Sequence, residues 1–130
     1  MMSIRSLAGA CLSAFAALSA FAVPASAQNY PTRTITMIVP FAAGGPTDVI
    51  SRIVTAHMAQ TLGQSIVIEN VVGAGGTTAT TRAARAANDG YTLVTGHMGT
   101  HAASVPLYPK LAYHPEKDFE PVALLAGTPI

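Results

Sequence analysis

The sequence predicts an α/β fold: a parallel sheet with flanking helices. Three observations predict it. Short runs rich in β-branched residues alternate along the chain with segments of helical periodicity. Each of the first three runs ends in a turn that contains glycine, and a helical segment follows each turn. Strands and helices that alternate in this order are typical of a parallel sheet with right-handed crossovers.

The first strand is expected at Thr34–Val39, a β-branched run that a proline closes. The turn Phe41–Pro46 follows it, and Thr47–Asp48 has the residue types of a helix N-cap. Gly63 is expected to end this helix. Apolar residues recur at helical spacing and give the helix one apolar stripe, made of Val49, Ile50, Ile53, Val54, Met58 and Leu62.

The same pattern repeats twice more. A second strand is expected at Ser65–Asn70, a glycine-rich turn at Val71–Gly76 and a helix near Thr77–Ala87. A third strand is expected at Tyr91–Thr95, and the glycine-bearing loop Gly96–His101 follows it. These elements complete the strand, helix, strand, helix, strand order of the predicted sheet.

The remaining chain is expected to hold a short helix up to Leu107, a surface connection at Tyr108–Glu120 and a fourth strand at Val122–Ala126. Only Gly127–Ile130 follow, with no closing helix, although a parallel strand needs cover on both faces. We therefore expect the 130 residues to be an N-terminal fragment or truncated product of a longer protein.

The first 27 residues have the pattern of a secretory signal peptide. Arg5 precedes the uncharged apolar segment Leu7–Val23, and small residues follow, with cleavage expected after Ala27. An uncleaved membrane anchor is the alternative, but the segment is short for a spanning helix and rich in alanine. Lipoprotein processing at Cys11 is disfavoured because the apolar run before it is too short.

Composition excludes several classes of protein. With 50% hydrophobic and only 10% charged residues, the chain is not intrinsically disordered. Seven basic and six acidic residues form no basic block, which excludes nucleic acid as a partner. The leader holds one basic residue, so the remaining chain carries six charges of each sign, which favours a small ligand. The single cysteine also leaves with the leader.

Glycine-rich turns follow all three predicted strands, so they are expected at one edge of the sheet, where ligands of open α/β folds bind. Glycine lets the backbone approach a ligand closely, and helix N-termini offer N–H groups to an anion. Threonine hydroxyls beside the turns can donate to a carboxylate. One glycine would indicate only a tight turn, but three at one edge favour a pocket.

Other kinds of site fit less well. Gly73-x-Gly75-x-x-Thr78 lacks the last glycine of a dinucleotide fingerprint. His97 and His101 have the spacing of a zinc pair, but a glycine lies between them and no third ligand is near. No nucleophile with a partner base stands out, so catalysis is not expected.

Single charged residues have simpler explanations. Asp48 is an acid favoured in the first turn of a helix, or an acceptor for an ammonium group or ordered water. His57 is expected to be structural, and Arg82 and Arg85 to be solvated.

The sequence resembles the Bug-type, TctC-like substrate-binding receptors of the tripartite tricarboxylate transporters. The likeness is carried by Ile38–Asp48 (IVPFAAGGPTD) and Asp89–Leu93 (DGYTL), together with further matches. These are Tyr30-Pro31, Leu62-Gly63-Gln64, Glu69-Asn70, Gly73-Ala74-Gly75-Gly76, Leu107–Leu111 and Asp118–Val122.

The resemblance implies the first domain of a periplasmic clamshell, with residues 28–130 forming the N-terminal portion of that domain. Such a receptor captures a small carboxylate for a membrane permease, without a cofactor and as a monomer. Backbone amides and ordered water of the first two turns hold the carboxyl group, and the third loop lines the opening. The expected ligand-binding residues are Phe41, Ala42, Ala43, Gly44, Gly45, Thr47, Asp48, Gly73, Gly75, Gly76, Thr77, Thr78, Gly99, Thr100 and His101.

Two other hypotheses remain open. The chain could be an exported α/β enzyme, a metal- or nucleotide-dependent hydrolase. It could also be a non-functional truncated remnant, because the second jaw of the clamshell is absent from the sequence.

Overall fold

The computed structural model describes residues 29–127, so the expected leader, Met1–Ala27, lies outside the described residues. A three-stranded parallel sheet forms the centre, in the order β2-β1-β3. Its strands are β1 (Ile35–Val39), β2 (Ile66–Asn70) and β3 (Thr92–Val94). Each lies within the run of residues predicted for it, so the parallel α/β fold class is confirmed.

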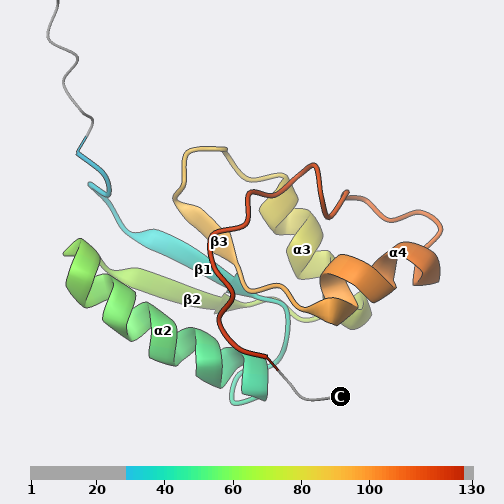
Figure 1. Ribbon diagram of the computed structural model, residues 1–130, viewed down its shortest axis with the longest axis horizontal. Helices are drawn as coiled ribbons and strands as arrows, with labels where there is room; N and C mark the ends of the chain where they lie inside the picture. The colour runs from blue at the N-terminus through green and yellow to red at the C-terminus, as the bar shows by residue number, and fades with distance from the viewer. Residues whose placement is uncertain (1–28, 128–130) are drawn as a thin grey trace, which may run out of the picture.

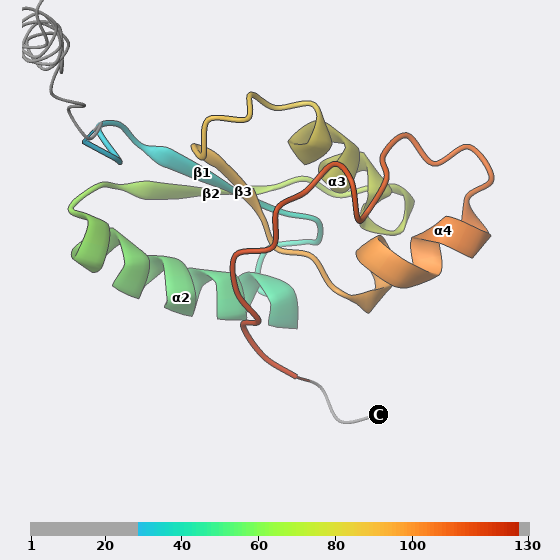
Figure 2. The same ribbon diagram turned by 45° about the horizontal axis from the view of Figure 1, so that its top comes forward.

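Two helices cover opposite faces of this sheet (Figures 1 and 2). Helix α2 (Pro46–Leu62) connects β1 to β2, and α3 (Thr77–Ala84) connects β2 to β3. The first connection leads from the central strand β1 to the edge strand β2. The second leads from β2 across β1 to the opposite edge strand, β3. Right-handed crossovers in opposite directions place their helices on opposite faces, which explains the layered arrangement.

The core is centred on β1. Ile35, Ile38 and Val39 are fully buried, because the central strand has a neighbour on each side and a helix on each face. The edge strand β2 is less protected, and the side chain of Val67 is exposed. From the other face, Ala79 of α3 packs into the same core.

The buried face of α2 does not coincide with its predicted apolar stripe. Asp48, Ser51 and Thr55 are buried, whereas Val49 and Ile53 are 46% and 58% exposed. The hydroxyls of Ser51 and Thr55 donate to the carbonyls four residues earlier, at 2.7 and 2.8 Å. Small, internally satisfied side chains therefore let the helix lie close to the sheet without an energetic penalty for burying a polar group.

The observed helix ends refine the prediction. Helix α2 begins at Pro46, and Gly45 precedes it without a side-chain cap, so the N-cap expected from Thr47–Asp48 is wrong. Proline suits the first helical position because its missing N–H would have no partner there. Gly63 ends α2 in the left-handed conformation, at φ 65°, as predicted. Helix α3 ends at Ala84, three residues earlier than expected.

After β3 the chain forms a π-helical turn, η2 (Gly99–Ala103), and the short helix α4 (Ser104–Leu107). Residues 108–127 follow without a regular element. Tyr113 anchors this segment, because its buried hydroxyl donates to the Thr100 carbonyl and lies 3.2 Å from Ser104 Oγ. Hydrogen bonds to two consecutive elements thus hold an irregular connection against the fold.

The fourth strand expected at Val122–Ala126 is wrong. These residues make no strand ladder, and Leu124 is 91% exposed. A short apolar run becomes a strand only where a neighbouring strand offers free hydrogen-bonding groups in register. Within residues 29–127, none of the helices combines the length and the apolar character that a bilayer crossing requires.

Candidate functional site: three loops at one sheet edge

The three strand-to-helix loops meet at the carboxyl edge of the sheet. We call them loop 1 (Phe41–Gly45), loop 2 (Val71–Gly76, ending in the 3-10 turn η1, Ala74–Gly76) and loop 3 (Gly96–His101). A Cβ built on Gly76 would lie 2.7 Å from Thr100 Cγ2 and 3.2 Å from Phe41 Cζ. All three loops therefore pack around one glycine, and the predicted shared edge is confirmed.

An aromatic stack joins loop 1 to loop 3. The rings of Phe41 and His97 lie parallel, with 4.7 Å between centroids and 7° between planes. Gly76 lies beside the Phe41 ring and has a φ of 91°, a backbone conformation that side chains rarely adopt. The absence of a side chain at this position is what allows loops 1, 2 and 3 to come so close.

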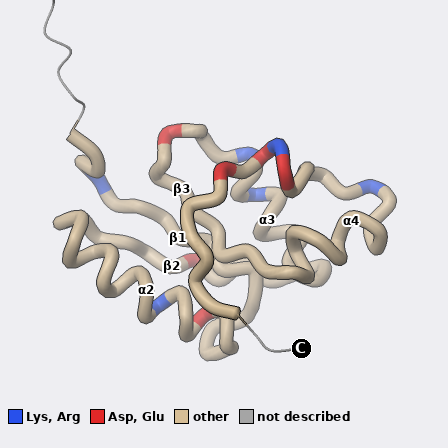
Figure 3. The backbone as a smooth tube through the Cα atoms, viewed as in Figure 1, with Lys and Arg blue, Asp and Glu red and all other residues tan. Residues whose placement is uncertain are grey.

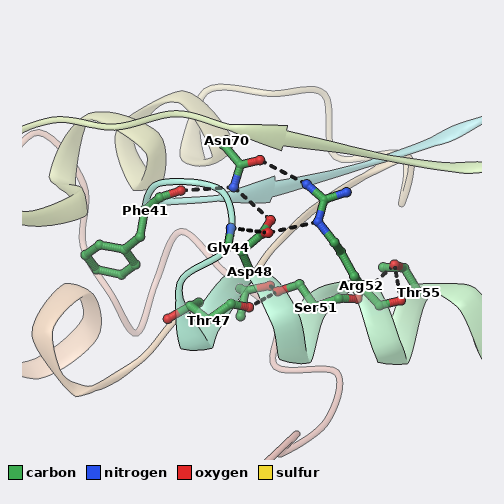
Figure 4. A network of polar contacts seen from close by, with 9 residues as sticks. Phe41, Gly44, Thr47, Asp48, Ser51, Arg52, Thr55 and Asn70 are labelled. Atoms are coloured by element: carbon green, nitrogen blue, oxygen red, sulfur yellow. Dashed lines mark hydrogen bonds and ion pairs between the residues drawn. The ribbon is translucent and has the colours of Figure 1, made fainter.

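Asp48 organises loop 1 from the inside (Figure 4). The residue is only 1% exposed, and its Oδ2 accepts hydrogen bonds from Arg52 Nε and from the Gly44 N–H, both at 2.8 Å. Oδ1 accepts from Asn70 Nδ2 at 2.9 Å. The hydrogen bond from Arg52, followed by those from Gly44 and Asn70, lowers the pKa of Asp48 far below its ordinary value. Asp48 is therefore a buried anion that shapes the loop, and the acceptor role considered for it from the sequence does not fit its position.

Asn70 and Arg52 complete this network, and neither was among the ligand-binding residues expected from the sequence. Asn70 Nδ2 also donates to the Phe41 carbonyl at 3.0 Å, and Arg52 Nη2 donates to Asn70 Oδ1 at 3.2 Å. Two features of the sequence could have indicated these residues. An arginine four residues after an aspartate can pair with it on a helix. Asparagine is disfavoured in strands, so its presence in one suggests that its side chain makes a specific hydrogen bond.

Several backbone N–H groups at this edge have no acceptor among residues 29–127. Ala42 and Ala43 in loop 1 are exposed, as are Ala74 and Gly75 in loop 2, and their N–H groups have no acceptor among residues 29–127. Consecutive free amides of this kind form concavities that bind anions. These four groups are among the donors that the edge can offer to a carboxylate.

Several of the other glycine amides predicted at the site are used within the protein, although the N–H of Gly73 has no acceptor among residues 29–127. The N–H of Gly44 donates to Asp48, that of Gly76 donates to the Gly73 carbonyl at 2.8 Å, and that of Gly45 donates to the Ala42 carbonyl at 3.3 Å. These glycines shape the loops. The amides beside them remain free for a ligand.

The four candidate threonines fall into two groups. Thr100 is fully buried and its hydroxyl bonds to the backbone of His97, while the Thr77 hydroxyl donates to the Ala74 carbonyl at 2.9 Å. The hydroxyls of Thr47 and Thr78 have no hydrogen-bond partner within the described residues. Thr47 and Thr78 are therefore the threonines placed to add a hydroxyl donor at this edge.

Loop 3 is built around two histidines. The His101 ring occupies the space beside Gly96, and the His97 ring occupies the space beside Gly99, whose N–H donates to His97 Nδ1 at 2.7 Å. His101 Nδ1 lies 2.9 Å from Thr100 Oγ1. Burial, and then the charge of His97, lower the pKa of His101, so its ring is neutral at physiological pH. In residues 29–127, no group of three His, Cys, Asp or Glu side chains is placed to hold a metal ion.

Other residues considered from the sequence lie on the surface. His57 is exposed on α2, and Arg82 forms an ion pair with Glu69 of β2. An open hollow of about 650 Å³ beside loop 2 is lined by Thr77, Thr78, Thr81, Arg82 and Arg85. Acidic and basic residues of the described chain lie interspersed along the backbone rather than on one basic face (Figure 3).

Comparison with curated proteins finds relatives that are longer than this chain. A UPF0065 protein from the TAR-I ttuE-ttuC' intergenic region of Agrobacterium vitis is 43% identical over 116 residues, which are 87% of this chain and 33% of the relative. BugT of Bordetella pertussis is 38% identical over 122 residues, 93% of this chain and 37% of BugT. The chain thus spans about a third of the length of the curated relatives it matches.

The chain also matches about a third of the length of several solved structures. MatC from Rhodopseudomonas palustris, described with bound malate, matches with a TM-score of 0.72 and 66% identity over 74% of this chain and 33% of MatC. The periplasmic binding protein BugD matches with a TM-score of 0.65 and 48% identity over 71% of this chain and 30% of BugD. R. palustris Rpa4515, described with adipate, matches with a TM-score of 0.65 and 39% identity over 67% of this chain and 29% of its own.

A family model confirms the resemblance found in the sequence. The model of the tripartite tricarboxylate transporter family receptor, TctC, matches residues 50–130, which include β2, loop 2, β3 and loop 3. With this match and its Bug relatives, the chain belongs to the tripartite tricarboxylate transporter receptor family.

Proposed function

We propose that this chain forms the first half of the binding site of a periplasmic receptor. The receptor captures a small organic di- or tricarboxylate and passes it to a membrane permease. The chain binds this solute and does not transform it, and neither a cofactor nor nucleic acid takes part. A cleaved leader over residues 1–27 exports the protein, which acts as a monomer.

The observation that carries the proposal is the presence of unbonded amides on exposed residues of both loop 1 and loop 2. Ala42 and Ala43 offer two N–H groups, and Ala74 and Gly75 offer two more, all at the same sheet edge. Oriented amides can bind an anion without a lysine or arginine in the site. A carboxylate has two oxygens that can accept from both loops at once.

The comparisons support the choice of ligand class. MatC is described with malate and Rpa4515 with adipate, and both are small dicarboxylates. Their matched segments correspond to this chain at 66% and 39% identity. The hydroxyls of Thr47 and Thr78 are the side-chain donors that would add to the amides in this chain.

The test is a thermal unfolding titration of the protein with malate, adipate and citrate, and with glycerol as an uncharged solute. Binding to the folded state adds about 2.7 kcal/mol at a hundredfold excess over Kd. We expect the unfolding midpoint to rise with the concentration of at least one acid and to stay unchanged with glycerol. If none of the acids raises the midpoint, the proposed function is wrong for this chain.

A matched pair of variants places the binding at the loops. Gly44 and Gly63 both have a positive φ, at 81° and 65°, and a Cβ at either position meets no atom within 4 Å. Gly44→Val and Gly63→Val therefore impose similar backbone strain, but only the first lies in loop 1. Gly44→Val should abolish the rise caused by the acid, and Gly63→Val should keep it. Equal responses of the two variants would exclude loop 1 from the site.

A further inference from the structure

We propose that Asn70, acting together with Asp48, is a positioning residue that holds loops 1 and 2 at a fixed spacing. The proposal rests on the proposed function, because the amides whose spacing is fixed are those assigned to the carboxylate. Neither residue touches the ligand in this proposal. Asn70 and Asp48 act by fixing the positions of the backbone amides of loop 1 relative to those of loop 2.

The first step is the closure of loop 1. Oδ2 of Asp48, in the first turn of α2, accepts the Gly44 N–H at 2.8 Å. This bond turns the Gly44 amide inward, while the N–H groups of Ala42 and Ala43 have no acceptor among the described residues. A buried carboxylate with a strongly lowered pKa keeps this arrangement at every physiological pH.

The second step is the link to loop 2. Asn70 is the last residue of β2 and pairs with Val39 at the end of β1, so loop 2 starts directly after it. Its Nδ2 donates to the Phe41 carbonyl at 3.0 Å and to Asp48 Oδ1 at 2.9 Å (Figure 4). The side-chain amide of Asn70, directly before loop 2, is thereby hydrogen-bonded both to Phe41, the first residue of loop 1, and to Asp48, which binds the Gly44 N–H of the same loop.

The third step fixes the direction of that amide. Arg52 donates from Nη2 to Asn70 Oδ1 and from Nε to Asp48 Oδ2. With its oxygen held by the guanidinium, the Asn70 side chain must present its NH₂ group to Phe41 and Asp48. The three side chains therefore form one connected network in which every observed bond agrees with the others.

The experiment compares Asn70→Ala with Glu69→Ala. Glu69 is the residue before Asn70 in β2, and it takes no part in the link between the loops. The Glu69→Ala variant loses an ion pair with Arg82, so it also removes a polar contact of the strand. In each variant, backbone amide exchange is measured by NMR without ligand, malate affinity is measured by calorimetry, and the unfolding midpoint is recorded. A residue that serves stability alone would change only the midpoint.

We expect Asn70→Ala to speed exchange of the Gly44 amide about tenfold, although that amide bonds to Asp48 and not to Asn70. We also expect malate affinity to fall about tenfold, since the loss of a partly buried hydrogen-bond donor is worth that much. Glu69→Ala should leave the exchange rate and the affinity within twofold of the parent protein. Restoration of slow exchange by Asn70→Gln would add support, because the longer amide can reach the same acceptors.

Unchanged Gly44 exchange in Asn70→Ala would overturn the proposal. If the parent protein binds neither malate nor another acid, the proposed function fails, and the exchange measurement alone still decides whether the loops are linked. If Asn70→Ala does not fold, Asn70→Asp takes its place under the same criteria. That variant keeps the shape and the Arg52 contact, but it cannot donate to Phe41 or Asp48, and it adds a second negative charge beside Asp48.

Discussion

The hydroxyl of Ser51 lies 2.7 Å from the hydroxyl of Thr95, in the buried contact between helix α2 and the end of β3. Thr95 also lies 3.4 Å from the sulfur of Met37 in the central strand. Ser51 donates to the Thr47 carbonyl, so both hydroxyls have partners. A helix that should pack through apolar residues thus meets the sheet through a polar contact.

Ser51→Ala is expected to destabilise the fold. The variant leaves the buried Thr95 hydroxyl without its best partner, which costs about 1–2 kcal/mol. Thr61→Ala is the control, because Thr61 makes the same type of bond to a carbonyl four residues earlier but is exposed. Urea unfolding should show a loss for Ser51→Ala and almost none for Thr61→Ala. Equal losses would mean that the contact with Thr95 does not matter.

Asp48→Asn is expected to weaken the fold at neutral pH. The pKa of Asp48 is lower in the folded protein than in the unfolded chain, so its contribution is complete above about pH 4 and is lost as the pH falls further. The stability difference between parent and variant should therefore shrink on acidification. Denaturant unfolding between pH 7 and pH 2.5 measures it, and a difference that is constant over this range would contradict the assignment.

His101 should give the fold a second, milder dependence on pH. Burial lowers its pKa, so below about pH 6.5 the unfolded chain takes up a proton before the folded protein does. Stability is expected to fall as the pH drops from about 7 to 5. His101→Gln should reduce this slope, whereas His57→Gln, on the exposed face of α2, should not. Identical slopes in the two variants would rule out His101 as the cause.

Gly76→Ala should be more damaging than Gly44→Ala. Both glycines have a positive φ, which costs an alanine about 1–2 kcal/mol. At Gly76 the added methyl group also meets Thr100 at 2.7 Å and Pro40 at 3.1 Å, which adds about 1–3 kcal/mol. Thermal or urea unfolding of the two variants separates the cost of crowding from the cost of conformation. Similar stabilities would show that the loops can move apart without loss.

Much of the fold could be predicted from local patterns. The strands around Ile35–Val39 and Ile66–Asn70, and the glycine that ends α2, follow from β-branched runs and from the left-handed conformation that Gly63 adopts. The expected strand at Val122–Ala126 failed because strand formation depends on a pairing partner, which composition does not reveal. The buried face of α2 was misjudged because Ser51 and Thr55 satisfy their own hydroxyls, so that burial costs little.

The position of the candidate site was also predictable, since parallel strands place their following loops at one edge. The sequence did not predict which hydrogen-bonding groups at this edge remain free for a ligand. The roles of Gly44 and Asp48 depend on Asn70, which is 22 residues away from Asp48 in the chain. Hydrogen bonds over such separations depend on the finished packing and leave only weak traces in the sequence.

The two histidines of loop 3 each fill the room left by a glycine, His101 beside Gly96 and His97 beside Gly99. A side chain cannot be added at either glycine unless the imidazole beside it moves, because the two groups would occupy the same volume. Substitutions at the paired positions should therefore show epistasis. A methyl group at Gly96 is tolerated best in a background where residue 101 is small, so drift in one member of a pair constrains the evolutionary path of the other.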